Sequence, residues 1–223
     1  MAIDKSHTSP LMKTGIILLA AIFLLGIGFA GLSAGLQGCS SSAPLLPGSG
    51  TTTTNTPAST ESTAAIALRY EAQGKAQEAS LTADPKNYSL LVAQGNLYLD
   101  WANAVQNTQS SQSPTSNPLW GSAKTYYARA VAIKATDAPV MGDYGISLFF
   151  SGETSAAIST GEKARALDPK LAVNLFMLGQ YYATAGENAK AVAAFQSYLA
   201  VAPTGDLATA AKTNITQLQT PTP

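Results

Sequence analysis

A period of thirty-four residues in the C-terminal part of the chain constrains its fold more than any other feature. Self-similarity at a fixed spacing of this kind is the sequence signature of stacked structural repeats. The period therefore predicts a row of similar small units, each packed on its neighbours. The pairs that stand at this spacing are Gly145 and Gly179, Leu148 and Tyr182, Ala157 and Ala191, Ala164 and Tyr198, and Pro169 and Pro203.

Two copies of the unit follow each other in strict register. The last copy is the clearer one, with Leu175-x2-Leu178-Gly179-x2-Tyr182, then Ala191-x3-Phe195, then Pro203. The middle copy has Met141-x2-Tyr144-Gly145-x2-Leu148, then Ala157, then Asp168-Pro169. It departs from the last copy at Gly161, where an aromatic residue is expected.

A first copy becomes visible once an insertion is allowed. It starts with Leu91-x2-Gln94-Gly95-x2-Tyr98 and resumes at Ala123-x3-Tyr127, with sixteen extra residues between the two parts. Residues 107–118 read NTQSSQSPTSNP, which is polar and punctuated by proline, so we expect a loop at 106–118. We interpret Trp101 and Trp120, which flank the insertion, as packing residues at the base of that loop.

These three copies resemble the tetratricopeptide repeat, whose pattern is W-x2-L-G-x2-Y, A-x3-F and P at the same period. The resemblance implies an all-α solenoid of helical hairpins, in which Gly and Ala stand where two helices approach most closely. A generic helical bundle is the alternative. The predicted domain covers 64–219, with a half-repeat helix at 64–83, repeats at about 88–137, 138–171 and 172–205, and a capping helix at 206–219.

An apolar segment near the N-terminus predicts a membrane anchor. From Gly15 the chain reads GIILLAAIFLLGIGFAGLSAGLQ, twenty-three residues without a charge, and a spanning helix needs about 20. Lys5 and Lys13 precede the segment, and the next Lys or Arg is Arg69. This asymmetry predicts that the N-terminus is cytoplasmic and that the repeat domain is extracytoplasmic, in the periplasm or at the cell surface.

The single cysteine of the chain suggests a second kind of anchor. Leu36-Gln37-Gly38-Cys39 resembles the lipobox of lipoprotein signal peptides, in which the cysteine is acylated and becomes the new N-terminus. Gln37 departs from that pattern, and the apolar stretch is longer than an ordinary signal peptide requires. We therefore keep both interpretations for 1–38, a cleaved signal peptide with a lipid on Cys39 and a retained transmembrane helix.

Residues 39–63 are predicted to form a flexible tether between the anchor and the folded domain. They are rich in Ser, Thr, Pro and Gly, and residues 40–60 carry no charge. Such a composition cannot bury enough apolar surface to offset the entropy of ordering.

The composition also excludes several kinds of chemistry from the folded part. Beyond Cys39 there is neither Cys nor His, so the domain has no disulfide, no Cys/His zinc site and no histidine-based catalytic dyad. The basic residues are scattered singly and net charge is zero, so we expect no nucleic-acid partner. We likewise expect no cofactor and no enzyme activity.

The family resemblance implies that the first helix of each repeat lines a concave groove that binds a protein or peptide partner. The chaperone-binding members hold a carboxylate with Lys and Asn, but Val92, Gly142 and Phe176 stand where this chain would need the Lys. We therefore expect a ligand with apolar anchors; for Phe149 and Phe176 the alternative is packing within the domain. The predicted groove residues are Val92 and Asn96, Ile146 and Phe149, and Phe176 and Gln180.

Three functions follow from these observations. The favoured one is a membrane-tethered extracytoplasmic scaffold for protein–protein interaction. The second is a permanent structural subunit of a larger membrane or envelope complex. The least favoured is a carboxylate-dependent hydrolase, because the acids weighed for it stand at helix ends, turns and helix surfaces. These acids are Asp84, Asp168, Glu153, Glu162 and Glu187.

Overall fold

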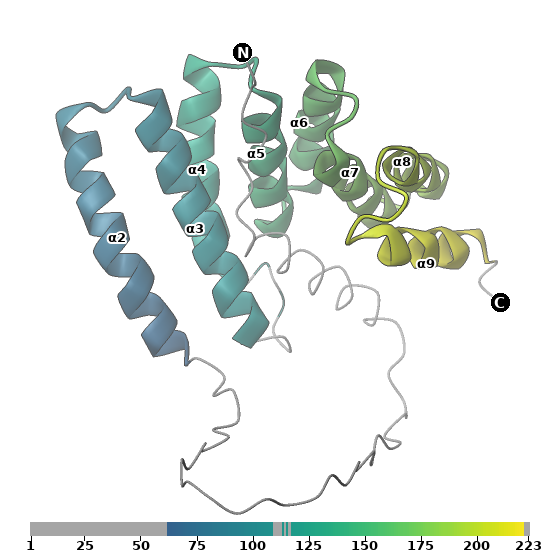
Figure 1. The fold of residues 1–223 in the computed structure, drawn as a ribbon, viewed down its shortest axis with the longest axis horizontal. Helices are drawn as coiled ribbons and strands as arrows, with labels where there is room; N and C mark the ends of the chain where they lie inside the picture. Colours follow the sequence, from purple (N-terminus) through teal and green to yellow (C-terminus); the bar gives the residue numbers. More distant parts are fainter. Residues whose placement is uncertain (1–61, 109–112, 114, 116, 221–223) are drawn as a thin grey trace, which may run out of the picture.

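The computed structural model describes residues 62–108, 113, 115 and 117–220, and over these residues the chain is all helical. Figure 1 shows the helices following one another in chain order along a single curved row. The apolar segment 15–37 and Cys39 lie outside the described residues. The helices are α2 (Thr63–Ala83), α3 (Tyr88–Thr108), α4 (Leu119–Ile133), α5 (Ala138–Phe150), α6 (Thr154–Leu167), α7 (Ala172–Thr184), α8 (Asn188–Val201) and α9 (Ala208–Gln219).

Each helix packs mainly on the helices next to it in sequence, as expected for a stack of hairpins. The pairs α3–α4, α5–α6 and α7–α8 are the three hairpins of the predicted repeats, and α2 and α9 flank them. The helix direction turns along the row, so that α8 is seen almost end-on where α2 and α3 are seen from the side (Figure 1).

The thirty-four-residue period reappears in the backbone of the turns. Gly152 and Gly186 have φ angles of 86° and 77°, a left-handed conformation that glycine adopts without strain. The amide of Glu153 donates to the carbonyl of Leu148 at 3.0 Å, and the amide of Glu187 donates to that of Tyr182 at 2.8 Å. The α5–α6 and α7–α8 turns therefore have the same closure, thirty-four residues apart.

Glycine and aromatic residues form the contact between the two helices of the first and third hairpins. A Cβ atom built on Gly95 would lie 2.7 Å from the ring of Tyr127, and one built on Gly179 would lie 2.5 Å from the ring of Phe195. Both rings are fully buried. Only glycine permits this approach, so the pattern in the sequence reflects direct packing.

The second hairpin has no such aromatic residue, and the third repeat fills the space. Leu178 of α7 packs on Gly161, where a built Cβ would lie 2.9 Å from the leucine Cδ2. The hydroxyl of Tyr181 of α7 lies 3.4 Å from the Cβ position of Gly145. Side chains of repeat three thus complete the core of repeat two.

The insertion of the first repeat differs from the prediction at its N-terminal end. A loop was predicted over 106–118, but α3 continues to Thr108 and has 21 residues, against 13 in α5 and 13 in α7. The extra turns persist because Ala102, Asn103 and Gln106 are buried. Asn117 then ties the far end of the insertion to α3, since its Nδ2 donates to the carbonyl of Ala102 at 3.1 Å.

The two tryptophans beside the insertion are packing residues, as predicted. Trp120 is fully buried and stacks on Phe150 with ring centroids 4.6 Å apart. Trp101 belongs to a row of stacked rings that joins α2, α3 and α4 and fixes the first helix to the stack. The row runs Tyr70, Trp101, Tyr98 and Tyr126, with neighbouring centroids 5.5 to 5.8 Å apart.

The capping helix α9 covers the C-terminal end of the stack, and the face that it turns toward α8 is buried. Leu207 and Ala211 are buried, and the amide of Leu207 donates to the hydroxyl of Tyr198 at 3.1 Å. Thr209, Lys212 and Thr213 are exposed on the outer side. A polar outer face is what the end of a repeat stack requires.

Candidate partner-binding surfaces

The first helices of the repeats lie next to one another. α3 contacts α5 and α5 contacts α7, in addition to the contacts within each hairpin. Contact between successive first helices is the arrangement expected on the inner side of a curved stack. We call the surface formed by α3, α5 and α7 the inner side, and all six predicted groove residues belong to these helices.

Phe176 does not offer a surface to a partner, which corrects its assignment as a groove anchor. Its side chain is 0% exposed, and its ring packs edge-on against Phe195 at 5.3 Å and Tyr198 at 5.6 Å between centroids. Both rings come from α8, the partner helix of the same hairpin. The alternative interpretation, packing within the domain, therefore describes Phe176.

Three other apolar groove residues are also largely buried. Ile146 is 1%, Phe149 is 6% and Val92 is 8% exposed. The ring of Phe149 packs against Phe150 at 5.2 Å and Tyr181 at 4.8 Å. These residues belong to the hydrophobic core more than to an open apolar groove, so apolar anchors cannot be the main feature that the inner side presents.

The two amide residues of the predicted groove have different environments. Asn96 is half-buried, and its Oδ1 accepts a 2.6 Å hydrogen bond from the hydroxyl of Tyr127, which orients its amide group. Gln180 is 8% exposed, and its Nε2 is buried without a hydrogen-bond partner within the described part of the chain. An unsatisfied buried donor is costly, and a carbonyl or carboxylate brought by a partner would satisfy it.

The inner side also contains a charged residue that the sequence analysis missed. Asp143 is the only charged residue of α5 and is 4% exposed. Burial raises its pKa well above the ordinary value, and the negative charges of Asp100 and Asp137 raise it further. The signal in the sequence was a lone acid inside the otherwise uncharged helix APVMGDYGISLFF, which a repeat pattern based on apolar positions does not register.

The acids that were considered for a hydrolase already have ion-pair or hydrogen-bond partners within the protein. Glu162 pairs with Arg165, Glu153 with Lys124 and Glu187 with Lys190. Asp84 accepts from the side-chain amide of Asn87 at 3.1 Å, and Asp168 accepts from the amide of Lys170 at 2.9 Å. Such surface pairs and turn contacts are ordinary in helical proteins.

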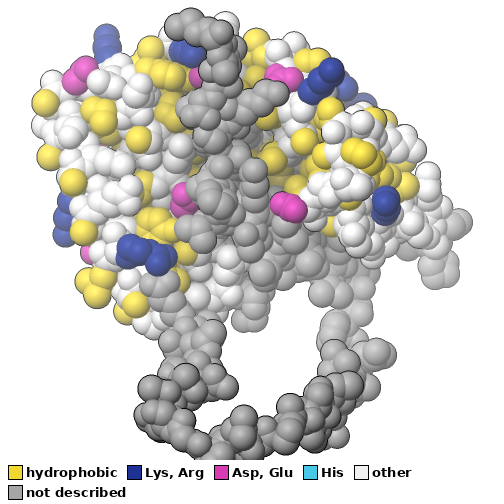
Figure 2. Space-filling view, in the orientation of Figure 1, with side chains coloured by type: hydrophobic (Ala, Val, Ile, Leu, Met, Phe, Trp, Pro, Cys, Tyr) yellow, Lys and Arg dark blue, Asp and Glu magenta, His cyan; other side chains and the backbone are white. Residues whose placement is uncertain are grey.

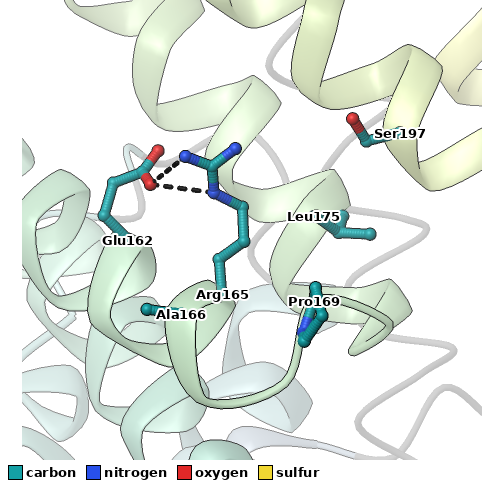
Figure 3. A pocket seen from close by; sticks show the side chains of 6 residues that line it. All are labelled: Glu162, Arg165, Ala166, Pro169, Leu175 and Ser197. Carbon is teal, nitrogen blue, oxygen red and sulfur yellow. Dashed lines mark hydrogen bonds and ion pairs between the residues drawn. The ribbon is translucent and has the colours of Figure 1, made fainter.

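A second concave region lies between α6 and α8, on the second helices of the hairpins. Figure 3 shows it as a hollow beside α7, with a volume of about 440 Å³, lined by Glu162, Arg165, Ala166, Pro169, Leu175 and Ser197. Glu162 is held by Arg165 and by the hydroxyl of Tyr182, which donates to it at 2.6 Å. Because its charged groups already pair with one another, this hollow presents no unsatisfied chemistry to a ligand.

On the face seen in Figure 2, the acidic and basic side chains of the described residues are scattered and form no concentrated patch of one charge. Among the described residues there is no group of three or more His, Cys, Asp or Glu side chains placed to hold a metal ion. None of the helices α2 to α9 combines the length and the apolar character needed to cross a membrane.

Three observations now agree on the type of fold. The chain forms hairpins of two antiparallel helices, it has a period of thirty-four residues, and glycine–aromatic contacts join the helices within hairpins. The fold is of the tetratricopeptide type. A crystal structure of MamA is similar to this chain, with 22% identity over 67% of this chain and 86% of that chain and a TM-score of 0.53. A second MamA structure has 23% identity over 68% of this chain and 78% of that chain, with the same TM-score of 0.53.

TTC0263, a thermophilic TPR protein in Thermus thermophilus, aligns at 15% identity over 72% of this chain and 82% of that chain, with a TM-score of 0.49. The sequence matches no family model and no curated protein.

Proposed function

We propose that this protein is a membrane-tethered scaffold whose tetratricopeptide-type domain binds a peptide or protein partner outside the cytoplasm. The proposal rests chiefly on the inner side, where three successive first helices place side chains along one surface. A surface of this kind is long enough to bind an extended or helical segment through several repeats. The amide groups of Asn96 and Gln180 supply polar contacts there.

The tether in this proposal is the apolar segment 15–37, followed by the Ser/Thr/Pro-rich linker 39–63. The segment is long enough to span a bilayer, and the lysines that precede it favour a cytoplasmic N-terminus. Cleavage with acylation of Cys39 and retention of a transmembrane helix both leave the repeat domain attached to the membrane on the same side.

Site-specific photo-crosslinking in native membranes tests the binding surface. A photoreactive amino acid is placed at Asn96 of α3 or at Val173, a half-buried residue of the first helix α7. Gln196, exposed on the second helix α8, is the matched control. We expect the two inner positions to give the same crosslinked partner and Gln196 to give none.

The opposite result, in which Gln196 crosslinks and the inner positions stay unmodified, would place the binding surface on the second helices. A constant set of stoichiometric adducts that persists through purification would favour the structural-subunit alternative over a scaffold with exchanging partners.

A further inference from the structure

The two ends of the helix stack expose different kinds of side chain. The outer side of α9 is polar, as the end of a repeat stack requires. At the other end, which α2 forms (Figure 1), Leu68 is 73% exposed, whereas no other large hydrophobic residue of the described chain exceeds 46%. The N-terminal end of the stack therefore departs from the rule that the C-terminal end follows.

The apolar residues around Leu68 form a continuous face of α2. Residues separated by three, four or seven positions share one side of a helix. By this spacing the buried residues that pack toward α3, among them Ile66, Tyr70 and Leu81, lie on one side, and Leu68 lies on the opposite side. The residues along the middle of that opposite side are all Ala or Leu, and all are exposed. We call it the outer face of α2, formed by Ala65, Leu68, Ala72, Ala76, Ala79 and Ala83.

The outer face of α2 suits a second helix better than an extended peptide. From Ala65 to Ala83 it follows one line along the helix for about 27 Å, at a rise of about 1.5 Å per residue. Alanine side chains are short, so a helix packed on them can approach to the short end of the usual range of about 8–10 Å between axes. An extended chain would leave its own N–H and C=O groups unpaired against a surface without polar side chains.

The charges beside the outer face favour a second copy of α2 as that helix. Glu71 and Lys75 stand on the same flank of the face, both are exposed, and neither forms an ion pair or hydrogen bond within the described part of the chain. When two copies pack antiparallel about a two-fold axis, the same flanks meet and every contact occurs twice. The register that places Glu71 of each copy opposite Lys75 of the other also places Leu68 next to Ala79.

We propose that the outer face of α2 is a self-association surface, through which two copies of this chain pair antiparallel about a two-fold axis. The two helices then begin about 31 Å apart, because α2 has 21 residues and rises by about 1.5 Å at each. The 23 residues from Cys39 to Glu61 precede α2, and a Ser/Thr/Pro/Gly-rich chain of that length spans about 24–29 Å. Both copies can therefore be tethered to one membrane.

A single pair of helices forms a small interface. Stable complexes of standard size bury about 1,200–2,000 Å² in total, and one helix packed on one helix gives less than that. Attachment of both copies to the same membrane raises their effective concentration and compensates for the small area. The pair carries two copies of the inner side, so a partner with two binding segments would be held by both.

Energy transfer between full-length proteins in phosphatidylcholine vesicles tests the surface. One population carries a donor dye at the C-terminus and the other an acceptor. We expect transfer between unaltered proteins, and we expect Leu68→Glu or Ala72→Glu to weaken the association by about tenfold or more, because each places a charge in the apolar contact. Leu167→Glu, the same change at an exposed leucine of α6, is the matched control and should keep the transfer.

An exchange of charges tests the antiparallel register. Glu71→Lys brings two lysines together in each contact and Lys75→Glu brings two glutamates together, so each variant alone should pair about tenfold more weakly. A mixture of the two variants restores opposite charges in both contacts, and so does the double variant Glu71→Lys/Lys75→Glu. We expect transfer to return in both cases. Circular dichroism of each variant establishes that the helical fold is retained.

The remaining outcomes would overturn the proposal. Transfer that persists in Leu68→Glu and in Ala72→Glu would show that the copies meet elsewhere, for example through the apolar segment 15–37. A mixture of Glu71→Lys and Lys75→Glu that transfers no better than either variant alone would exclude the antiparallel register. Neither result touches the inner side, so the crosslinking test of the scaffold function is decided separately.

Discussion

Phe176→Ala provides the sharpest test of the packing described for the third hairpin. The ring is 0% exposed and contacts Phe195 and Tyr198 edge-on, so truncation removes a buried aromatic side chain and two ring contacts at once. Phenylalanine-to-alanine changes in cores cost about 3–5 kcal/mol, which includes the cavity left behind. With a urea dependence of about 2 kcal/mol/M, the unfolding midpoint should fall by about 2 M.

The assay is urea unfolding followed by circular dichroism at the helical signal, on a fragment that starts at Glu61. Phe176→Leu serves as the control, because it keeps most of the apolar volume and should cost far less, about 1.5 kcal/mol or below. If Phe176→Ala and Phe176→Leu lowered the urea midpoint by the same small amount, the reasoning would be refuted. The ring would then be free on the inner side, where the sequence pattern had placed it as an anchor for a partner.

Further predictions concern a turn, a buried charge and the anchor. Gly186→Ala should destabilise the domain by about 1–2 kcal/mol, because φ is 77° at this position. Gly121→Ala, within helix α4 and with open space around its Cβ position, should be neutral or stabilising. The urea midpoints of the two variants measure the difference. Asp143 has a pKa raised by burial above the unfolded value of about 3.9, so its contribution to stability is present below that pH and is lost as pH rises. Asp143→Asn should therefore flatten this loss and raise the urea midpoint at neutral pH. If Cys39 is acylated, Cys39→Ser should leave a heavier, unprocessed precursor that is still membrane-bound, which intact-mass spectrometry would detect. If the unaltered protein and Cys39→Ser both retain residues 1–38 and show no processing, the anchor is a transmembrane helix.

The sequence predicted the repeat architecture well because the features that define it are local. Gly95 and Gly179 stand opposite Tyr127 and Phe195 in their own hairpins, and a fixed spacing expresses that contact directly. The predicted half-repeat helix at 64–83 corresponds to α2 at Thr63–Ala83, and the capping helix predicted at 206–219 corresponds to α9 at Ala208–Gln219.

The features that the sequence did not predict depend on tertiary contacts between helices. Phe176 stands at a position that faces the groove in a generic repeat, but aromatic side chains of α8 enclose it here. Asp143 is 4% exposed, and its only sign in the sequence is that it stands alone in an otherwise uncharged helix, which a pattern based on apolar positions does not register. The extension of α3 to Thr108 likewise depends on tertiary packing, because Asn103 and Gln106 are buried, whereas the polar sequence that follows had predicted a loop from 106 onward.

The way in which the second and third repeats share a core has a consequence for how the chain can be shortened. Gly161 and Gly145 leave space that Leu178 and Tyr181 occupy, so α5 and α6 have no complete interior until α7 is in place. Removal of the last repeat, 172–205, would expose the preceding one as well, so the loss of thirty-four residues would also unfold the thirty-four of 138–171. During synthesis, which starts at the N-terminus, repeat two would accordingly stay incompletely folded until α7 has been made. The last two repeats would therefore fold in a single step.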